Sequence, residues 1–132
     1  MSRPRSTKPT DAELSILKVL WRKGPSTVRD VQEALNVERR TGYTTALKLM
    51  QIMTEKGLVS RDESNRAHVY QPSSSEDETQ QQIVGDLLDR VFGGSAAKLV
   101  LHSLSSQQAT PQDIQQIREM LAKLEQEQTG NV

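Results

Sequence analysis

The apolar residues in the first part of the chain recur at the spacing of two amphipathic helices. Thr10 and Glu13 have the spacing of a capping box, so a helix is predicted from there to the Lys-Gly-Pro run at 23–25. Its apolar face carries Leu14, Leu17, Leu20 and Trp21. Trp21 is expected to belong to the core rather than to a binding platform. A second helix is predicted after Ser26 as N-cap, with an inner face of Val28, Val31 and Leu35.

A third amphipathic helix is predicted from about Thr41 to Gly57, where the glycine suits the C′ position of a helix end. Its buried stripe, at i, i+3, i+4 and i+7, consists of Ala46, Leu49, Met50 and Met53. The opposite face and its edge are polar and carry Thr41, Thr44, Thr45, Lys48, Gln51 and Glu55. By itself, this helix leaves open whether the polar face binds a partner or is simply solvated.

Two short β-like runs follow at 58–61 and 67–71, and the Asp, Ser and Asn between them at 62–66 suit a turn. Three short helices followed by a hairpin is the order of a winged helix-turn-helix, in which the third helix reads DNA and the hairpin is the wing. The predicted fold class is therefore mainly α with a small β-hairpin.

The second half of the chain is predicted to be helical, with apolar faces that need a partner. Ser75 caps a fourth helix that ends near Gly93, a brief helix follows at 95–104, and Thr110 caps the last helix. The fourth helix carries more apolar surface than a monomeric arm would leave to water: Ile83, Val84, Leu87, Leu88 and Val91. The last helix has a short a/d seam of Ile114, Ile117, Leu121 and Leu124. A helical dimerisation module is therefore expected after the winged helix.

Composition and charge agree with two modules. The 132 residues fit one domain, or one domain with an oligomerisation arm, and 34% of them are hydrophobic. The net charge of zero divides into +5 up to Gln71 and −5 from Pro72 onward, which is typical of a nucleic-acid-binding module joined to an assembly module. We predict a DNA-binding domain at 1–71, with a basic arm at 1–9, and a dimerisation domain at 72–132. No apolar run has the length of a membrane span, and the N-terminus lacks the apolar segment of a signal peptide, so a cytoplasmic protein is expected.

Candidate DNA contacts lie on the third helix and the hairpin. Thr and Gln side chains can bond base edges or phosphates, and Lys or Arg supplies charge to phosphate. In an isolated helix a solvated face is the better interpretation, but the helix-helix-helix-hairpin order behind a basic arm favours a reading face. Tyr43 can pack inward or touch the DNA backbone, and contact is favoured. The predicted DNA-binding residues are Thr41, Tyr43, Thr44, Thr45, Lys48, Gln51, Arg61, Arg66 and His68.

Catalysis, metals and cofactors find no support in this sequence. There is no cysteine, and the only histidines, His68 and His102, fall in different modules. Neither histidine is near a plausible nucleophile with an orienting acid, and Gly93-Gly94 lacks the residues of a phosphate loop. We therefore expect no enzyme activity, no metal and no cofactor.

Four stretches in register resemble the BlaI/MecI penicillinase-repressor family: PTDAELSILKVLW, GYTTALKLMQIMTEKGLVSR, RAHVYQP and DLLDRVFGGSAAKLVLHSL. The resemblance covers about residues 9 to 125. It implies a dimeric winged-helix repressor on a palindromic operator, with DNA contacts from the third helix and the wing. It also implies a dimer interface built from Leu87, Val91, Phe92, Leu99, Leu101, Ile117, Leu121 and Leu124.

Two departures from the family pattern bear on induction. The copper-responsive branch ends in a cysteine-rich motif that is absent here. The β-lactamase branch is cut at an Asn-Phe bond in the helix after the glycine pair, where this chain has His102-Ser103. The sequence therefore leaves open the inducing signal, the operator and the regulated genes, with a sensor or protease as a possible partner. A ligand-responsive regulator and a winged-helix module used only for protein–protein assembly remain as alternatives.

Overall fold

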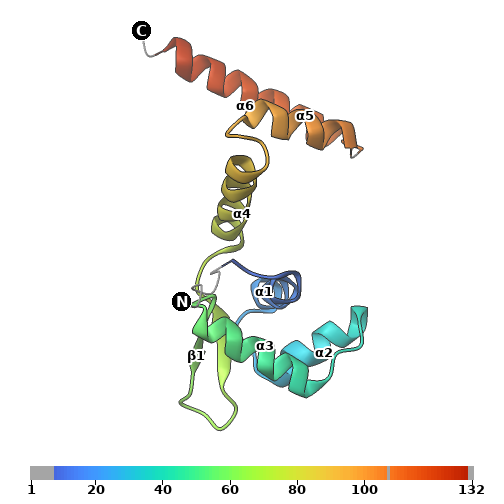
Figure 1. The fold of residues 1–132 in the computed structure, drawn as a ribbon, viewed down its shortest axis with the longest axis vertical. Helices are drawn as coiled ribbons and strands as arrows, with labels where there is room; N and C mark the ends of the chain where they lie inside the picture. The colour runs from blue at the N-terminus through green and yellow to red at the C-terminus, as the bar shows by residue number, and fades with distance from the viewer. Residues whose placement is uncertain (1–7, 107, 131–132) are drawn as a thin grey trace. The chain divides into compact units, whose positions relative to one another are not determined.

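The computed structural model describes residues 8–106 and 108–130, so residues 1–7 of the predicted basic arm lie outside the described residues. Within the described ranges, three helices, a two-stranded hairpin and three further helices follow one another (Figure 1). They are α1 (Asp11–Lys23), α2 (Val28–Glu38), α3 (Tyr43–Glu55), β1 (Val59–Asp62), β2 (Val69–Pro72), α4 (Glu76–Arg90), α5 (Ala96–Ser106) and α6 (Pro111–Thr129). The predicted fold class, mainly α with a small β-hairpin in winged-helix order, is confirmed.

A capping box begins α1, as predicted. Thr10 Oγ1 accepts a hydrogen bond from the Glu13 N–H at 3.2 Å, and Glu13 Oε1 accepts one from the Thr10 N–H at 2.8 Å. These bonds satisfy two amide groups that the first turn of a helix otherwise leaves without partners. The helix ends at Gly24, whose N–H donates to the Leu20 carbonyl.

The start of α2 differs from the prediction by one residue. Its N-cap is Thr27, whose Oγ1 accepts from the Asp30 N–H at 3.1 Å, and not Ser26. Ser26 is instead paired with Tyr70 of β2 through two backbone hydrogen bonds of 3.0 and 2.8 Å. The prediction of Ser26 was wrong because a long-range strand contact uses its backbone, which local sequence rules do not consider.

A tight turn at Gly57 ends α3 and leads directly into the hairpin. The Gly57 N–H donates to the Thr54 carbonyl at 3.1 Å and the Leu58 N–H donates to the Met53 carbonyl at 2.9 Å, which is the Schellman pattern. Gly57 has φ +79°, a left-handed conformation that glycine adopts without the strain a side chain would add. The predicted glycine stop is confirmed.

The hairpin is antiparallel, with Val59 opposite Pro72 and Asp62 opposite Val69. β2 begins at Val69 and not at residue 67, so the predicted start of this strand was wrong and Ala67 lies in the loop. The loop is closed locally because Asp62 Oδ1 accepts hydrogen bonds from the N–H and the hydroxyl of Ser64 at 2.9 and 2.6 Å. We call β1, β2 and the loop 63–68 the wing.

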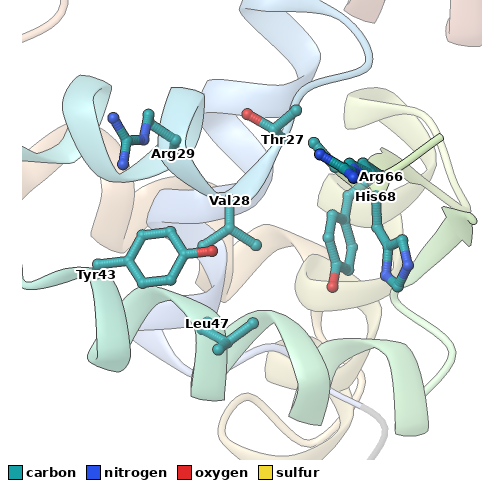
Figure 2. Close-up of a pocket in the computed structure, with 9 residues that line it drawn as sticks. Thr27, Val28, Arg29, Tyr43, Leu47, Arg66 and His68 are labelled. Carbon is teal, nitrogen blue, oxygen red and sulfur yellow. The ribbon is translucent and has the colours of Figure 1, made fainter.

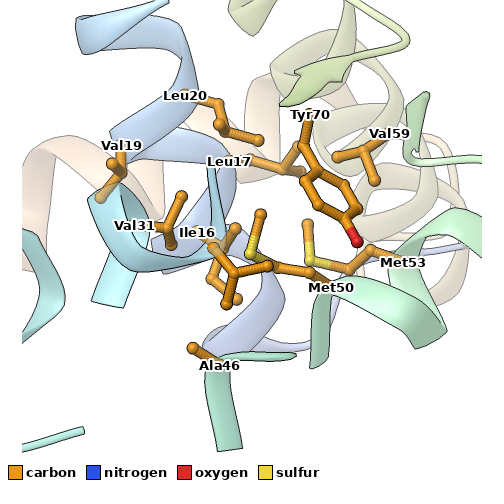
Figure 3. Packing of buried hydrophobic residues seen from close by; sticks show 11 residues of the cluster. Ile16, Leu17, Val19, Leu20, Val31, Ala46, Met50, Met53, Val59 and Tyr70 are labelled. Atoms are coloured by element: carbon orange, nitrogen blue, oxygen red, sulfur yellow. The ribbon is translucent and has the colours of Figure 1, made fainter. Parts of the chain in front are cut away.

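The core beside the wing takes one face from each of α1, α2, α3 and the hairpin (Figure 3). The predicted stripe of α3 is buried at Ala46, Met50 and Met53, whereas Leu49 is only partly buried. Trp21 is likewise partly buried and packs against the core, and its Nε1 donates to the Ser74 carbonyl at 3.0 Å. The buried apolar residues are Ile16, Leu17, Val19, Leu20, Val28, Val31, Ala46, Met50, Met53, Val59 and Tyr70. Because one side of α3 is packed in the core, its other side is held in a fixed orientation.

The chain forms two compact units, one that ends at Val84 and one that begins at Gly85. This division falls within α4. The domain boundary predicted from the sequence lies between 71 and 72, and it stays a prediction. Ser75 caps α4 as predicted, since its hydroxyl accepts from the Glu78 N–H at 3.1 Å. None of the described helices is long and apolar enough to cross a membrane.

The second unit contains the end of α4 together with α5 and α6. Thr110 caps α6, accepting from the Asp113 N–H at 3.0 Å, and Pro111 occupies the first turn, as predicted. The rings of Phe92 and His102 are 5.6 Å apart between their centroids and tilted by 49°. Within this unit, many large apolar side chains remain exposed: Leu87, Val91, Val100, Leu101, Leu104, Ile114, Met120, Leu121 and Leu124.

Candidate nucleic-acid interface

We call α3 the reader helix. Its outward face is polar and open to solvent. Thr44, Thr45, Lys48 and Gln51 are all exposed. Tyr43, the first residue of the helix, is 47% exposed, so its ring is not a core side chain. Because the opposite face is held in the core, these hydroxyl, amide and ammonium groups keep one direction and suit the groups of a DNA groove.

Thr41 lies in the loop before the reader helix and is tied into that loop. Its N–H donates to Asn36 Oδ1 at 2.6 Å, and its hydroxyl donates to the Arg39 carbonyl at 3.0 Å. Its own carbonyl accepts from Gln32 Nε2 at 3.1 Å. These bonds make Thr41 a residue that positions the start of the reader helix, and its predicted contact with DNA stays a prediction.

A buried ion pair holds the other end of the reader helix. Lys56 Nζ donates to Glu13 Oε1 at 2.6 Å and to the Lys8 carbonyl at 2.8 Å, and the two charged side chains are 8% and 2% exposed. Burial by itself raises the pKa of the Glu13 carboxyl. The hydrogen bonds from Lys56 and Thr10 and the charge of Lys56 outweigh that effect, so the pKa lies below its ordinary value.

The predicted residues of the wing differ in their surroundings. Arg61 forms an ion pair with Glu63, and hydrogen bonding with the Tyr70 side chain and with Glu63 raises the pKa of its guanidinium. Arg66 and His68 lie in the loop 63–68 and are exposed. Arg61 therefore helps to shape the wing, whereas Arg66 and His68 offer their side chains to a partner.

The reader helix and the wing meet at one pocket of about 330 Å³. Figure 2 shows the Tyr43 hydroxyl pointing into it, with Arg29 on the α2 side and Arg66 and His68 on the wing side. Its lining consists of Thr27, Val28, Arg29, Tyr43, Leu47, Arg66, Ala67, His68 and Tyr70. We call this the reader–wing pocket. It brings together three of the predicted DNA-binding residues, Tyr43, Arg66 and His68, from two segments of the chain.

Arg29 and Thr27 also line this pocket, and neither was predicted from the sequence. They belong to the beginning of α2, and the backbone pairing of Ser26 with Tyr70 holds that beginning against β2. No local sequence pattern predicts that the beginning of α2 lies beside β2, because this depends on a contact between residues 44 positions apart. The arginine two residues after the helix cap was the one available signal.

Within residues 8–106 and 108–130, no group of three or more His, Asp or Glu side chains could hold a metal ion. His68 lies in the wing loop and His102 in α5, each in a different compact unit. The chemistry that the described site offers is hydrogen bonding and positive charge.

The predicted dimer-interface residues all belong to the unit that begins at Gly85. Leu87, Val91, Leu101, Leu121 and Leu124 are exposed, and Val91 and Leu101 are exposed by 59% and 65%. The remaining three, Phe92, Leu99 and Ile117, are partly buried. Exposed apolar side chains along successive helices are typical of a surface that another chain covers.

Three helices and a hairpin around one core, with an outward polar helix beside a wing that exposes Arg66 and His68, define a winged-helix protein of the class that binds DNA. The chain belongs to the penicillinase repressor family, whose sequence model matches residues 9–123. The resemblance drawn from the four sequence stretches is confirmed.

Proteins of similar sequence carry the names of bacterial regulators and repressors. The transcriptional regulator BlaI of Mycobacterium tuberculosis (strain H37Rv) is 34% identical over 121 residues, which are 90% of this chain and 86% of that protein. The penicillinase repressor of Bacillus licheniformis is 23% identical over 85% of this chain and 88% of its own length. The solution structure of monomeric B. licheniformis BlaI with the blaP half-operator matches with a TM-score of 0.46 and 23% identity, over 58% of this chain and 90% of that chain.

Proposed function

We propose that this protein is a homodimeric transcriptional repressor that binds a palindromic operator in double-stranded DNA. The observation that carries the proposal is the exposed polar face of the reader helix, Thr44, Thr45, Lys48 and Gln51, held by a buried opposite face. The described relatives are transcriptional regulators and repressors, which supports the same role here. A dimer on a palindrome places the two reader helices on equivalent half-sites.

In this proposal, Lys48 contacts phosphate or guanine, and Thr44, Thr45 and Gln51 contact base edges. Tyr43, Arg66 and His68 contact the DNA backbone beside the groove. Arg61 and Thr41 act mainly on the shape of the site, since Arg61 is paired with Glu63 and Thr41 is bonded within its loop. The positive net charge of the first 71 residues suits the DNA backbone.

The proposed dimer uses the eight interface residues, from Leu87 to Leu124. Support comes from the exposure of Val91, Leu101 and Leu121, which would otherwise leave apolar surface in water. A second copy is the occupant that fits best, because a repressor of a palindromic site needs two identical halves.

The proposal also includes a cytoplasmic location and a protein without enzymatic activity or cofactor. Relief of repression by a sensor or a protease belongs to the same proposal. Support for the absence of catalysis is the chemistry of the site: its described polar groups are suited to binding, and the described relatives carry the names of regulators.

A gel-shift titration tests the function directly. The purified protein is mixed with labelled duplexes that cover the region upstream of its own gene, and with a duplex of shuffled sequence at the same salt concentration. A specific complex at a protein concentration roughly 1,000-fold below that needed for the shuffled duplex is expected. Equal, weak binding to both duplexes would instead favour a winged-helix module used only for protein–protein assembly.

A further inference from the structure

The reader–wing pocket joins two parts of the proposed interface that the sequence treats separately. Its floor is apolar, from Val28 and Leu47, and the polar groups stand around it. Arg29 comes from α2, Tyr43 from the reader helix, and Arg66 and His68 from the wing. In Figure 2 the arginine of α2 and the two wing residues lie on different sides of the pocket, with the Tyr43 hydroxyl between them.

The positive groups of the pocket are open to a partner. Arg29 and Arg66 are both exposed, and among the residues that the structure describes no ion pair includes either of them. This distinguishes them from Lys56, which is buried against Glu13, and from Arg61, which is paired with Glu63. A partner that occupies the pocket therefore meets uncompensated positive charge on two sides and a hydroxyl between them.

The position of Arg29 is fixed by the fold rather than by its own contacts. Ser26, three residues before it, exchanges backbone hydrogen bonds of 3.0 and 2.8 Å with Tyr70, and Tyr70 is itself buried in the core. Arg29 lies between the two residues of the capping box of α2. The Thr27 N–H donates to Asp30 Oδ2 at 3.0 Å, and the Asp30 N–H donates to Thr27 Oγ1 at 3.1 Å. The beginning of α2 is thus held against the wing.

We propose that the reader–wing pocket holds a stretch of the sugar–phosphate backbone of operator DNA, with Arg29 as a phosphate contact that acts together with Arg66 on the opposite side. This inference rests on the proposed function. Two separated guanidinium groups with a hydroxyl between them match a chain of successive phosphates, and an apolar floor suits the sugar between two phosphates. The pocket then fixes the position of the DNA strand, while the exposed face of the reader helix reads the bases.

A phosphate contact has a measurable signature. Each phosphate that a cation neutralises adds about 0.9 to the steepness with which binding falls with salt on a double-logarithmic plot. Arg29→Ala should lower that slope by roughly 0.9, and Arg29→Ala with Arg66→Ala should lower it by roughly 1.8. Between about 50 and about 200 mM salt, the affinity ratio of wild type to Arg29→Ala should then shrink by about 3.5-fold.

The test measures binding of the full-length protein to its operator and to shuffled duplex across that salt range. The variants are Arg29→Ala, Arg29→Lys, Arg66→Ala, the double variant Arg29→Ala with Arg66→Ala, and Lys48→Ala. Lys18→Ala is the control, because Lys18 is exposed on α1 and does not line the pocket. Circular dichroism and thermal unfolding check that each variant is folded. We expect Arg29→Ala to weaken both duplexes by a similar factor, Arg29→Lys to keep most of the salt slope, and Lys18→Ala to bind like wild type.

The outcomes separate this inference from the proposed function. Wild-type affinity and slope for Arg29→Ala, with weaker binding by Lys48→Ala, would overturn the phosphate contact and leave the repressor proposal standing. Loss of operator binding by Arg29→Ala with unchanged binding to shuffled duplex would make Arg29 a base contact and would also overturn it. If no variant altered binding, the proposed interface itself would be wrong.

Discussion

Glu13 and Lys56 form a buried ion pair, with 2.6 Å between Oε1 and Nζ, that joins the first turn of α1 to the end of the reader helix. Glu13 also completes the capping box of α1 through the Thr10 N–H. One carboxylate therefore caps one helix and anchors another. Since the reader helix is held in the core by its inner face and at its end by this pair, its polar face keeps a fixed direction toward a partner.

Removal of one partner of this pair should destabilise the protein strongly. Lys56→Met leaves the Glu13 carboxylate buried without its cation, and we expect a loss of about 3 kcal/mol in the free energy of unfolding. Lys18→Met, at an exposed position of α1, should change that free energy by less than about 0.5 kcal/mol. Urea denaturation measures both. A loss for Lys56→Met no larger than the control's would mean that the pair does not hold the helix end.

The same pair should make stability depend on pH in one direction. The pKa of Glu13 is lowered in the folded protein, so its stabilising contribution is present above the ordinary glutamate range, about 4.3, and is lost as the pH falls through the lowered folded-state pKa. Glu13→Gln should therefore be less stable than wild type at pH 7, and the difference should shrink toward acid pH. A difference that grew on acidification would contradict the direction of this pKa shift.

Dimerisation can be tested at the seam of α6. Leu121 is 52% exposed, and an aspartate there would put a charge into the proposed interface. We expect Leu121→Asp to sediment as a monomer and to bind the operator weakly, because one half-site gives few contacts. Gln126→Asp, exposed on the opposite face of the same helix, serves as the control and should stay dimeric. Wild-type protein that sediments as a monomer at micromolar concentration would remove the dimer from the proposal.

Release by a sensor-protease of the β-lactam type should be inefficient at His102-Ser103. Ser103 cannot fill a subsite shaped for an aromatic ring, and the lost burial costs a few kcal/mol. The bond also lies inside α5, where the Ser103 hydroxyl donates to the Leu99 carbonyl at 2.8 Å. Incubation with the activated protease domain of such a sensor, followed by mass spectrometry of the fragments, should yield little product. Efficient cleavage between His102 and Ser103 would overturn this expectation.

Local sequence rules predicted most of the elements, and they failed where long-range contacts determine the local structure. The cap at Thr10, the stop at Gly57 and the buried stripe of Ala46, Met50 and Met53 follow from spacing and backbone preferences alone. The cap of α2 was misplaced because Ser26 pairs with a distant strand residue, which spacing does not report.

The site shows the same division. The exposed positions of the reader helix follow from helical periodicity. Lys48 must lie on the face opposite the one that buries Met50. Arg29 could not be assigned in this way, because its place across the reader–wing pocket from Arg66 depends on the packing of α2 against the wing. The ion pair between Arg61 and Glu63 was likewise not predicted, since Glu63 was considered only as part of a turn.

The central claim is that the outward face of the reader helix binds operator DNA, and operator affinity across a salt series tests it most directly. Lys48→Ala should weaken binding to operator and shuffled duplex together and reduce the salt slope, whereas Thr44→Ala should relax base preference at a cost of about 1–3 kcal/mol. Both side chains are exposed and outside the core, so the folded state should be retained. Wild-type affinity, base preference and salt slope in both variants would contradict the claim.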